Sequence, residues 1–591
     1  MIFAAVRRIR VLEVVLLLIL VALAPLATAQ KAVDKSAVDA LYERGLQALQ
    51  KGDLAAARDT FEKVVRLAPN APEGHNSLGW VLMTTGHVDD AVKQLRAAVK
   101  LRPDFVHAHI NLANALAAKL DSEGAVNEAR TAVKLAPSNS EAHRTLGRVL
   151  SFRQDTAGAI SEFRRAVELD PAQPMLHDEL GTLLAQNSQL DEAAAEFSEA
   201  LRLQPNFAAS QLHLGVIRWK QHSLEQAQHL LQSAVELTPQ GADGHYYLAR
   251  VFADKGDRDG AVRELQSAVK LRPNFSEAQT QLGLMLQRQG DASGAVAAYR
   301  QVVEAQPQNA DAHNNLGLAL IQVGDAPGAI PEFQAALRFK PDDSDYRGNL
   351  GTAYLQRTDF DAAIAEFQTA LRSAPDDATL HYNLGLALKL KDQLPAAIAE
   401  FQKAEQLDPA QADVHYTLGV TLWQQGESAR AVEELQLAIK ARPDYAEAYY
   451  TLGTVLKQQG TLQESAKALR EAIRRQPDFA GAHTTLAAVL RQLGDTEGAA
   501  KESKLGAEMA RSANALQAAT FSTNSGRRLL SAGDLDGAIS QFRSAILQLD
   551  SYAPAHFYLA QALRRKGQSG EAEREFRKAV ELDPRLKAPS E

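Results

Sequence analysis

The 591-residue sequence contains no cysteine. This absence excludes disulfide bonds, thiolate metal sites, thiol nucleophiles and lipid attachment through cysteine. Aromatic residues are also scarce, at 6% of the chain, although 46% of it is hydrophobic. Ala, Leu, Gln, Glu, Arg and Lys dominate the rest, and all of them are good helix formers. The composition therefore predicts an all-α fold that is held together by packing alone.

The chain also has no excess of positive charge: its formal net charge is −8 at pH 7. Such a surface has no general attraction for phosphate backbones, so nucleic acid is not an expected partner. The sequence also lacks the H-E-x-x-H, G-x-x-x-x-G-K, G-x-G-x-x-G and G-x-S-x-G motifs of common metal, nucleotide and nucleophile sites. We therefore expect no enzyme activity, no catalytic residue and no cofactor.

The first 29 residues have the parts of a secretory signal peptide. A positive start is followed by an apolar run at 14–23, a proline at 25 and small residues at 27–29. Because this pattern directs export and cleavage, we expect residues 1–29 to be removed before Gln30. The alternative is an uncleaved N-terminal anchor, which would then be the chain's contact with the membrane. The expected location is periplasmic or secreted, or alternatively N-terminally membrane-anchored.

Proline recurs at a fixed interval along most of the chain. Thirteen prolines lie 34 residues apart, at 69, 103, 137, 171, 205, 239, 273, 307, 341, 375, 409, 443 and 477. A fixed period of this length is the signature of a repeat architecture. With each proline as the thirty-second residue of a unit, fourteen repeats fill 38–513 after a linker at 30–37. Residues 514–518 break the register, two more repeats fill 519–586, and 587–591 form a tail.

Other positions of the repeat recur independently of the prolines. Position 8 is Gly or Ala in all sixteen repeats, position 20 is Ala in fifteen, and position 7 is Leu in fourteen. Small residues at 8 and 20 allow two helix axes to pack closely. Gly-Asp pairs near position 15, such as Gly324-Asp325, predict the turn between the helices, and the proline ends the second helix. Each repeat is thus predicted to be a helical hairpin.

This pattern resembles the tetratricopeptide repeat, and the resemblance covers 38–586. The stretches at 312–320 and 381–389 are similar to the repeats that precede the catalytic domain of O-linked N-acetylglucosamine transferases, but no segment is left for that domain. The resemblance implies a right-handed α-solenoid superhelix of about sixteen helix-turn-helix units. It also implies that the first helices line a concave groove and that the groove captures a ligand.

Ten of the fifteen histidines lie at position 4 of a repeat: His75, His109, His143, His177, His245, His313, His381, His415, His483 and His556. We interpret them as packing residues with an apolar body and a polar tip. Zinc needs ligands that converge at about 2.1 Å, whereas histidines of successive repeats lie on separate helices. No metal site is therefore expected.

In the resembled family the groove is lined by positions 2, 5, 9, 12 and 13 of each first helix. Binding surfaces are enriched in aromatic residues, and all three tryptophans fall on these positions, as do several tyrosines. The densest group lies in repeats eleven to thirteen and comprises Tyr382, Lys389, Tyr416, Trp423, Tyr450 and Lys457. Trp80 and Trp219 are further candidates. The alternative is that these rings pack between adjacent first helices.

Position 6 carries Asn in three consecutive repeats, at Asn315, Asn349 and Asn383. In the resembled transferases an asparagine ladder holds the backbone of a bound peptide, which suits the paired donor and acceptor of an amide. Acidic residues recur at position 2 and are expected to make one edge of the groove negative, although helix capping accounts for most of them. These residues complete the predicted peptide-binding set.

The expected function is an exported scaffold or adaptor that binds peptide segments or protein partners in its groove. A cell-envelope assembly, secretion or polysaccharide-export complex is the expected setting. One alternative is a non-catalytic subunit that presents substrates to a glycosyltransferase or another enzyme, and a second is a structural spacer. Self-association through the C-terminal end is a further possibility, because no separate capping helix follows the last repeat.

Overall fold

The computed structural model describes residues 35–586, which form 31 helices and contain no strand. The predicted signal peptide at 1–29 and the tail at 587–591 lie outside these residues, as does most of the predicted linker. The first helix begins at Lys35, one turn before the predicted start of the first repeat. No helix within 35–586 is long and apolar enough to cross a membrane. The predicted all-α class is confirmed.

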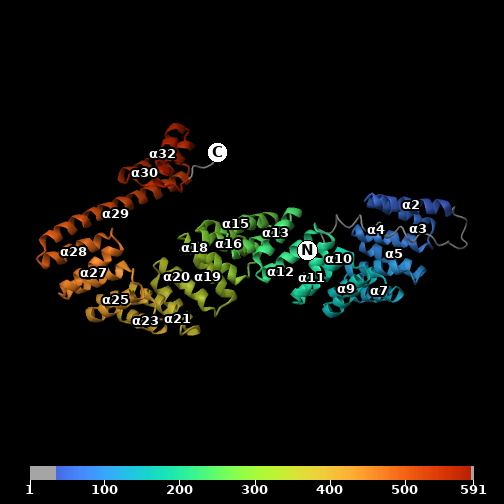
Figure 1. Cartoon of the computed structure of the whole chain (residues 1–591), viewed down its shortest axis with the longest axis horizontal. Coiled ribbons are helices and arrows are strands. Elements are labelled where there is room, and N and C mark those ends of the chain that lie inside the picture. Colours follow the sequence, from blue (N-terminus) through green and yellow to red (C-terminus); the bar gives the residue numbers. More distant parts are fainter. Residues whose placement is uncertain (1–34, 587–591) are drawn as a thin grey trace. The chain divides into compact units, whose positions relative to one another are not determined.

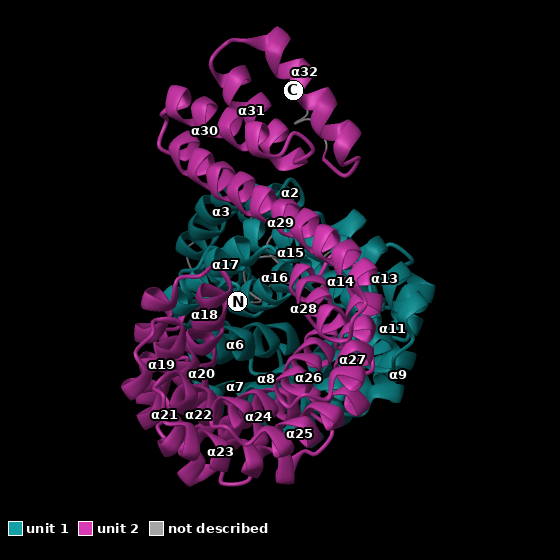
Figure 2. Ribbon diagram, turned by 90° about the vertical axis from the view of Figure 1, so that its left-hand side faces the viewer, with its two compact units in different colours: residues 1–305 teal, residues 306–591 magenta. Residues whose placement is uncertain are grey.

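The chain divides into two compact units, residues 1–305 and 306–591 (Figure 2). The described helices of the first unit are α2 (Lys35–Gln50), α3 (Leu54–Leu67), α4 (Pro72–Thr84), α5 (Val88–Leu101), α6 (Val106–Ala118), α7 (Ser122–Leu135), α8 (Ser140–Phe152), α9 (Thr156–Leu169), α10 (Pro174–Gln186), α11 (Leu190–Leu203), α12 (Ala208–Lys220), α13 (Leu224–Leu237), α14 (Ala242–Asp254), α15 (Arg258–Leu271), α16 (Ser276–Gln289) and α17 (Ala292–Ala305). They are the helix pairs of repeats one to eight.

The second unit holds repeats nine to sixteen. Its described helices are α18 (Ala310–Gln322), α19 (Ala326–Phe339), α20 (Ser344–Gln356), α21 (Phe360–Ser373), α22 (Ala378–Leu390), α23 (Leu394–Leu407), α24 (Ala412–Gln424), α25 (Ser428–Ala441), α26 (Ala446–Gln458), α27 (Leu462–Arg475), α28 (Ala480–Gln492), α29 (Thr496–Ser531), α30 (Leu535–Gln548), α31 (Ala553–Arg565) and α32 (Ser569–Leu582). Within this unit α18 to α28 follow an arc (Figure 2). Each unit is therefore an α-solenoid of stacked helix pairs.

One helix is shared by two repeats. Helix α29 is 36 residues long and serves as the second helix of repeat fourteen and the first helix of repeat fifteen (Figure 1). Residues 514–518 lie inside it. The sequence from 511 to 518 contains neither Pro nor Gly, and Arg511 stands where fourteen of the other fifteen repeats have the terminal proline. Without a residue that ends the helix, the backbone continues through the junction.

The turn inside each repeat has the same left-handed residue. Position 15 has a positive φ in all sixteen repeats, ten times at glycine and six times at another residue: Leu120, Gln154, Ser188, His222, Thr358 and Asp392. The residue after it caps the second helix, and Asp257, for example, accepts a hydrogen bond from the Gly260 amide at 2.8 Å. The predicted turn and cap are therefore confirmed.

Within each repeat, position 8 of the first helix faces the side chain at position 24 of the second. At Gly317 an added Cβ would lie 2.6 Å from the Phe333 ring, which is fully buried. Eight aromatic residues at position 24 face a glycine: Phe61, Phe163, Phe197, Tyr299, Phe333, Phe367, Phe401 and Phe542. Where position 8 is Ala, position 24 is Ala129, Leu265 or Ser503, and Phe576 in the last repeat is the exception. The sizes at the two positions are therefore complementary.

The position-4 histidines do more than pack. Each ring joins its own second helix to the preceding repeat, and we call this arrangement the histidine bridge. Nδ1 lies 2.6–2.8 Å from the Glu or Gln at position 23. Nε2 lies 2.8–3.2 Å from the carbonyl oxygen at position 32 of the preceding repeat. The bridge therefore links every pair of neighbouring repeats in which it occurs.

Nine of the ten bridges contain a glutamate, and both partners of the ring are then pure acceptors. At His109, burial lowers the pKa, but the hydrogen bonds to Glu128 and to the Pro103 carbonyl outweigh it, so the pKa lies above its usual value. A raised pKa favours the imidazolium form, in which both ring nitrogens donate. The His109 bridge is thus an ion pair as well as a hydrogen-bonded link.

We expect Gly351→Ala to lower the free energy of unfolding by about 1–3 kcal/mol, because its Cβ would be driven into Phe367, whose ring atom Cε1 lies 2.6 Å away. Adding Phe367→Leu should recover part of the loss, since the smaller side chain makes room. Gly570 is the matched control: its Cβ would meet no atom within 4 Å, so Gly570→Ala should be neutral or stabilising. Urea unfolding of these three variants and of Phe367→Leu alone measures this, and strictly additive costs of the two changes would contradict it.

The histidine bridge should make stability depend on pH. The raised pKa of His109 means that its contribution is complete below the unfolded pKa of about 6.5 and is lost as pH rises through the folded value. We expect His109→Gln to cost about 1–3 kcal/mol at pH 5.5 and less at pH 9. Thermal melts across this range measure the difference. His229, which is exposed, provides the control variant His229→Gln, and a His109→Gln cost that is constant with pH would argue against the ion pair.

Candidate functional site

Four predicted aromatic residues lie on three consecutive first helices of the second unit. Tyr382 is on α22, Tyr416 and Trp423 are on α24, and Tyr450 is on α26. All four are half-buried. We call these four residues the aromatic stripe.

Each tyrosine of the stripe packs on a second ring of its own repeat. Tyr382 lies 5.7 Å from Phe401, measured between ring centroids. Tyr416 lies 4.9 Å from Tyr445, and Tyr450 lies 4.7 Å from Phe479. The rings at 445 and 479 are the last residues of their repeats, immediately before the next first helix. These contacts fix the orientation of the stripe tyrosines.

The stripe also joins neighbouring first helices. The Tyr382 hydroxyl lies 3.3 Å from the Thr417 hydroxyl on α24. Trp423 Nε1 donates to Gln458 Oε1 on α26 at 2.6 Å. The rings therefore pack between adjacent first helices, as the alternative interpretation expects, and they keep an exposed part at the same time. Their positions are held from both sides before any ligand arrives.

Lys389, Trp423 and Lys457 occupy position 12 of three consecutive repeats. The two predicted lysines therefore lie on either side of Trp423. Lys389 and Lys457 are half-buried. Burial lowers the pKa of Lys389. Within the described part of the chain neither ammonium group has an ion-pair or hydrogen-bond partner. Lys389 is thus a partly desolvated cation without an anion.

Arg442, on the same group of repeats, has an acidic partner. Arg442 lies 2.5 Å from Asp413 and places its guanidinium 4.5 Å from the centre of the Tyr445 ring, which in turn packs on Tyr416. The hydrogen bond from Arg442 lowers the pKa of Asp413. The same pairing of position 31 with position 2 occurs at Arg102–Glu73, Arg272–Asp243 and Lys340–Asp311. These acids are therefore neutralised, and the expected negative edge is weaker than the sequence indicates.

At least one of the three predicted asparagines is already hydrogen-bonded within the protein. Asn349 Nδ2 donates to Asn314 Oδ1 of the preceding repeat at 2.9 Å, so this amide already links two repeats. Asn315 on α18 and Asn383 on α22 are half-buried. The ladder therefore has a structural role in at least one of its three members.

The candidates of the first unit lie apart from one another. Trp80 on α4 packs against the hydrophobic core. Trp219 on α12 donates from Nε1 to Asp254 at 2.7 Å, and the guanidinium of Arg250 lies 4.8 Å from its ring centre. This hydrogen bond joins position 12 of one repeat to position 13 of the next, as does the bond from Trp423 to Gln458. Unlike Trp423, however, Trp219 is covered by a cation of the protein itself.

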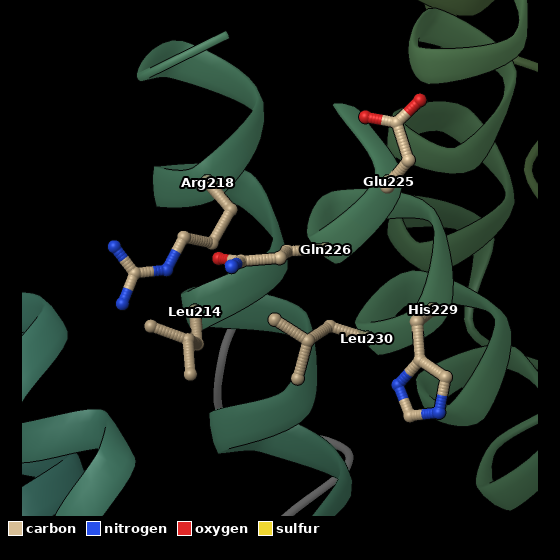
Figure 3. A pocket seen from close by; sticks show the side chains of 6 residues that line it. All are labelled: Leu214, Arg218, Glu225, Gln226, His229 and Leu230. Carbon is tan, nitrogen blue, oxygen red and sulfur yellow. The ribbon is translucent and has the colours of Figure 1, made fainter. Parts of the chain in front are cut away.

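A shallow hollow lies on repeat six of the first unit, between α12 and α13. It is lined by Leu214, Arg218, Glu225, Gln226, His229 and Leu230 (Figure 3). Arg218 stands at position 11, which is Leu, Phe, Tyr or Ala in every other repeat. The Glu225 and His229 side chains point away from each other (Figure 3). The hollow therefore shows no convergent pair of polar groups.

Sequence reasoning missed two features that the repeat alignment contained. Glutamate or glutamine occupies position 23 in all ten repeats that have His at position 4, and this pairing predicts the bridge. Metal donors converge at one place in the described residues, where Glu405 joins the bridge of His415 and Glu434. Glu405 occupies a position that is aliphatic in nearly all repeats, and that departure was the available signal.

Comparisons with known proteins agree with this geometry. The tetratricopeptide repeat matches residues 21–72, 111–174, 179–225, 280–344, 349–412, 416–478, 450–519 and 523–586, and a second description of the same repeat matches 48–120 and 218–283. No curated protein matches the chain by sequence.

Several solved structures are similar to the chain. The Cut9–Hcn1 hetero-tetramer of the APC/C is 16% identical, with 90% of this chain and 97% of that chain covered and a TM-score of 0.36. YrrB, described as a TPR protein with an unusual peptide-binding site, is 25% identical over 30% of this chain and 93% of its own, with a TM-score of 0.28. Yeast Tom70 is 16% identical over 72% and 96%, with a TM-score of 0.30.

The family matches cover well over half of the sequence and overlap all sixteen repeats. Repeats of this kind typically serve as non-catalytic scaffolds for protein–protein interaction. The chain therefore belongs to the tetratricopeptide repeat family.

Proposed function

We propose that the protein is a scaffold that binds an extended, acidic segment of a protein partner on the aromatic stripe and its two flanking lysines. The observation that carries this proposal is Lys389. A half-buried ammonium without an anion is costly to keep, and here it lies in the same row as Trp423 and Lys457. A carboxylate of a ligand would supply the missing partner.

The spacing of the repeats suits an extended peptide. First helices that pack about 10 Å apart are crossed by about three residues of an extended chain at roughly 3.3 Å per residue. A segment of about nine residues would thus span repeats eleven to thirteen. Fixed, half-exposed rings lose little conformational entropy on binding. Side chains of the segment would pack on the stripe while its acidic groups reach the lysines.

We also propose that the protein works outside the cytoplasm of a bacterium, within an envelope assembly, secretion or export complex. The sequence pattern of residues 1–29 supports this part of the proposal.

The double variant Lys389→Gln/Lys457→Gln should bind the partner segment at least tenfold more weakly, because two charge-assisted contacts are lost. The weakening should shrink at high salt. A partner captured from an envelope extract is first mapped to a segment of about ten residues, whose affinity is then measured by fluorescence anisotropy. The charge-matched control is Lys403→Gln/Lys440→Gln, on the second helices α23 and α25. Equal affinities for the two double variants would refute the stripe as the binding site.

The same experiment separates the two alternatives. A catalytic protein that co-purifies and depends on Lys389 for binding would favour a substrate-presenting subunit. Failure to capture any partner by either the wild type or the control variant would favour a structural spacer.

Export has its own test. When the full chain is produced in a bacterial host, we expect mass spectrometry of the periplasmic fraction to find a mature N-terminus at Gln30. A variant with Arg7, Arg8 and Arg10 changed to Glu should remain in the cytoplasm, because the positive start of the signal is lost. A chain that keeps Met1 and fractionates with membranes would instead indicate the uncleaved anchor.

A further inference from the structure

One repeat carries an acidic residue where the others are aliphatic. Position 28 is Val, Leu or Ile in fourteen of the sixteen repeats, Ala507 in repeat fourteen, and Glu405 in repeat eleven. This position lies near the end of the second helix and packs toward the next repeat. Val, Leu and Ile contribute apolar burial there, whereas a glutamate must be solvated or paired. Glu405 therefore needs water or a polar or charged partner.

Glu405 on α23 faces the histidine bridge of the next repeat. His415 on α24 places Nδ1 2.8 Å from Glu434 Oε2 on α25 and 3.8 Å from Glu405 Oε1. The three donor atoms all lie within 4.8 Å of one another. The His415 side chain is 5% exposed, Glu434 16% and Glu405 26%. The group is thus inside the repeat interface but open to solvent on the Glu405 side.

The second ring nitrogen of His415, Nε2, already makes the hydrogen bond that metal-binding histidines commonly make. Its Nε2 lies 3.0 Å from the Pro409 carbonyl oxygen, to which it donates. Histidines that bind a metal through one nitrogen commonly donate the other N–H to a backbone carbonyl, which fixes the tautomer and the ring orientation. With Nε2–H committed to Pro409, loss of the other proton leaves Nδ1 as a free ligand that points at two carboxylates.

We propose that Glu405, His415 and Glu434 form a binding site for a divalent cation of the zinc type. One imidazole nitrogen and two carboxylate oxygens suit Zn²⁺, with water in the fourth position. Bonds of about 2.0 Å in a tetrahedron require ligand atoms roughly 3.3 Å apart, a spacing that the observed 2.8 and 3.8 Å bracket. Two carboxylates and a neutral imidazole carry a charge of −2, which the cation neutralises.

The surrounding charges leave this site available. Glu405 Oε1 lies 3.8 Å from His415 Nδ1, beyond hydrogen-bond distance, so the second carboxylate is not satisfied by the histidine alone. Arg430 is the cation close to Glu405, and its guanidinium is bonded to Glu427 at 2.6 Å. The bound cation would tie repeat eleven to repeat twelve beside Tyr416, the neighbour of His415 in sequence.

The other histidine bridges act as controls within the same chain. His381, for example, contacts Glu400 at 2.6 Å and the Pro375 carbonyl at 3.0 Å, yet the residue at position 28 of the preceding repeat is Leu371. A single carboxylate and one histidine do not complete a zinc site. Among the described residues, only the bridge of His415 brings two carboxylates to the same ring nitrogen; the second carboxylate near His556, that of Asp550, lies 4.0 Å from the other nitrogen, Nε2.

The test is a Zn²⁺ titration of tag-free full chain after chelation, followed by calorimetry and by metal analysis of the dialysed protein. We expect one Zn²⁺ per chain and a rise in melting temperature of about 3 °C in excess Zn²⁺. Titrations in two buffers of different ionisation enthalpy should show proton release below the pKa of His415, because the Nδ1 proton must leave.

Glu405→Val restores the residue type of the other repeats and should therefore fold normally. It should lose the bound Zn²⁺, the thermal shift and the proton release together. His381→Gln should keep all three. Equal Zn²⁺ stoichiometry in Glu405→Val and the wild type would overturn the proposal, as would a wild-type chain that binds no Zn²⁺. A Glu405→Val variant without helicity is replaced by Glu405→Gln, for which the same outcomes apply.

Discussion

The contact between position 8 and position 24 sets the distance between the two helices of each repeat. Glycine at position 8 presents bare backbone, and the ring at position 24 fills the space that a Cβ would occupy, as at Gly317 and Phe333. The other packing positions, including the alanine at position 20, fit only at this spacing. A chain with few aromatic residues can therefore hold its hairpins together, because eight of its rings pack on a glycine of the facing helix.

A solenoid also needs contacts between repeats, since each repeat touches only its neighbours. The histidine bridge supplies one that is both buried and directional. His143, for example, joins Glu162 of its own second helix to the Pro137 carbonyl of the repeat before. The same proline that ends a helix therefore also provides the acceptor for the next repeat. Where Gln211 or Gln279 replaces the histidine, only the bond to the carbonyl is made.

The same scaffold explains why functional candidates appear as departures from the pattern. Position 12, which carries Trp423 and Lys389, varies from repeat to repeat, and Glu405 differs from the aliphatic residues at its own position. A regular repeat fixes where each side chain lies, so an unusual residue is presented at a defined place without disturbing its neighbours. Repeats eleven to thirteen collect several such departures, which makes this part of the second unit the best candidate for binding.

The sequence by itself determined the fold class, the period, the turn at position 15 and the small residues at the helix contact, because each is local or repeats in register. Tertiary structure decided the partners. Asn349 is hydrogen-bonded to Asn314, Lys389 lacks an anion, and Arg442 neutralises Asp413. These outcomes depend on side chains 29–35 residues apart in the sequence, or on the absence of such a side chain. Helical period fixes which face a residue occupies, whereas distances between repeats fix what that residue touches.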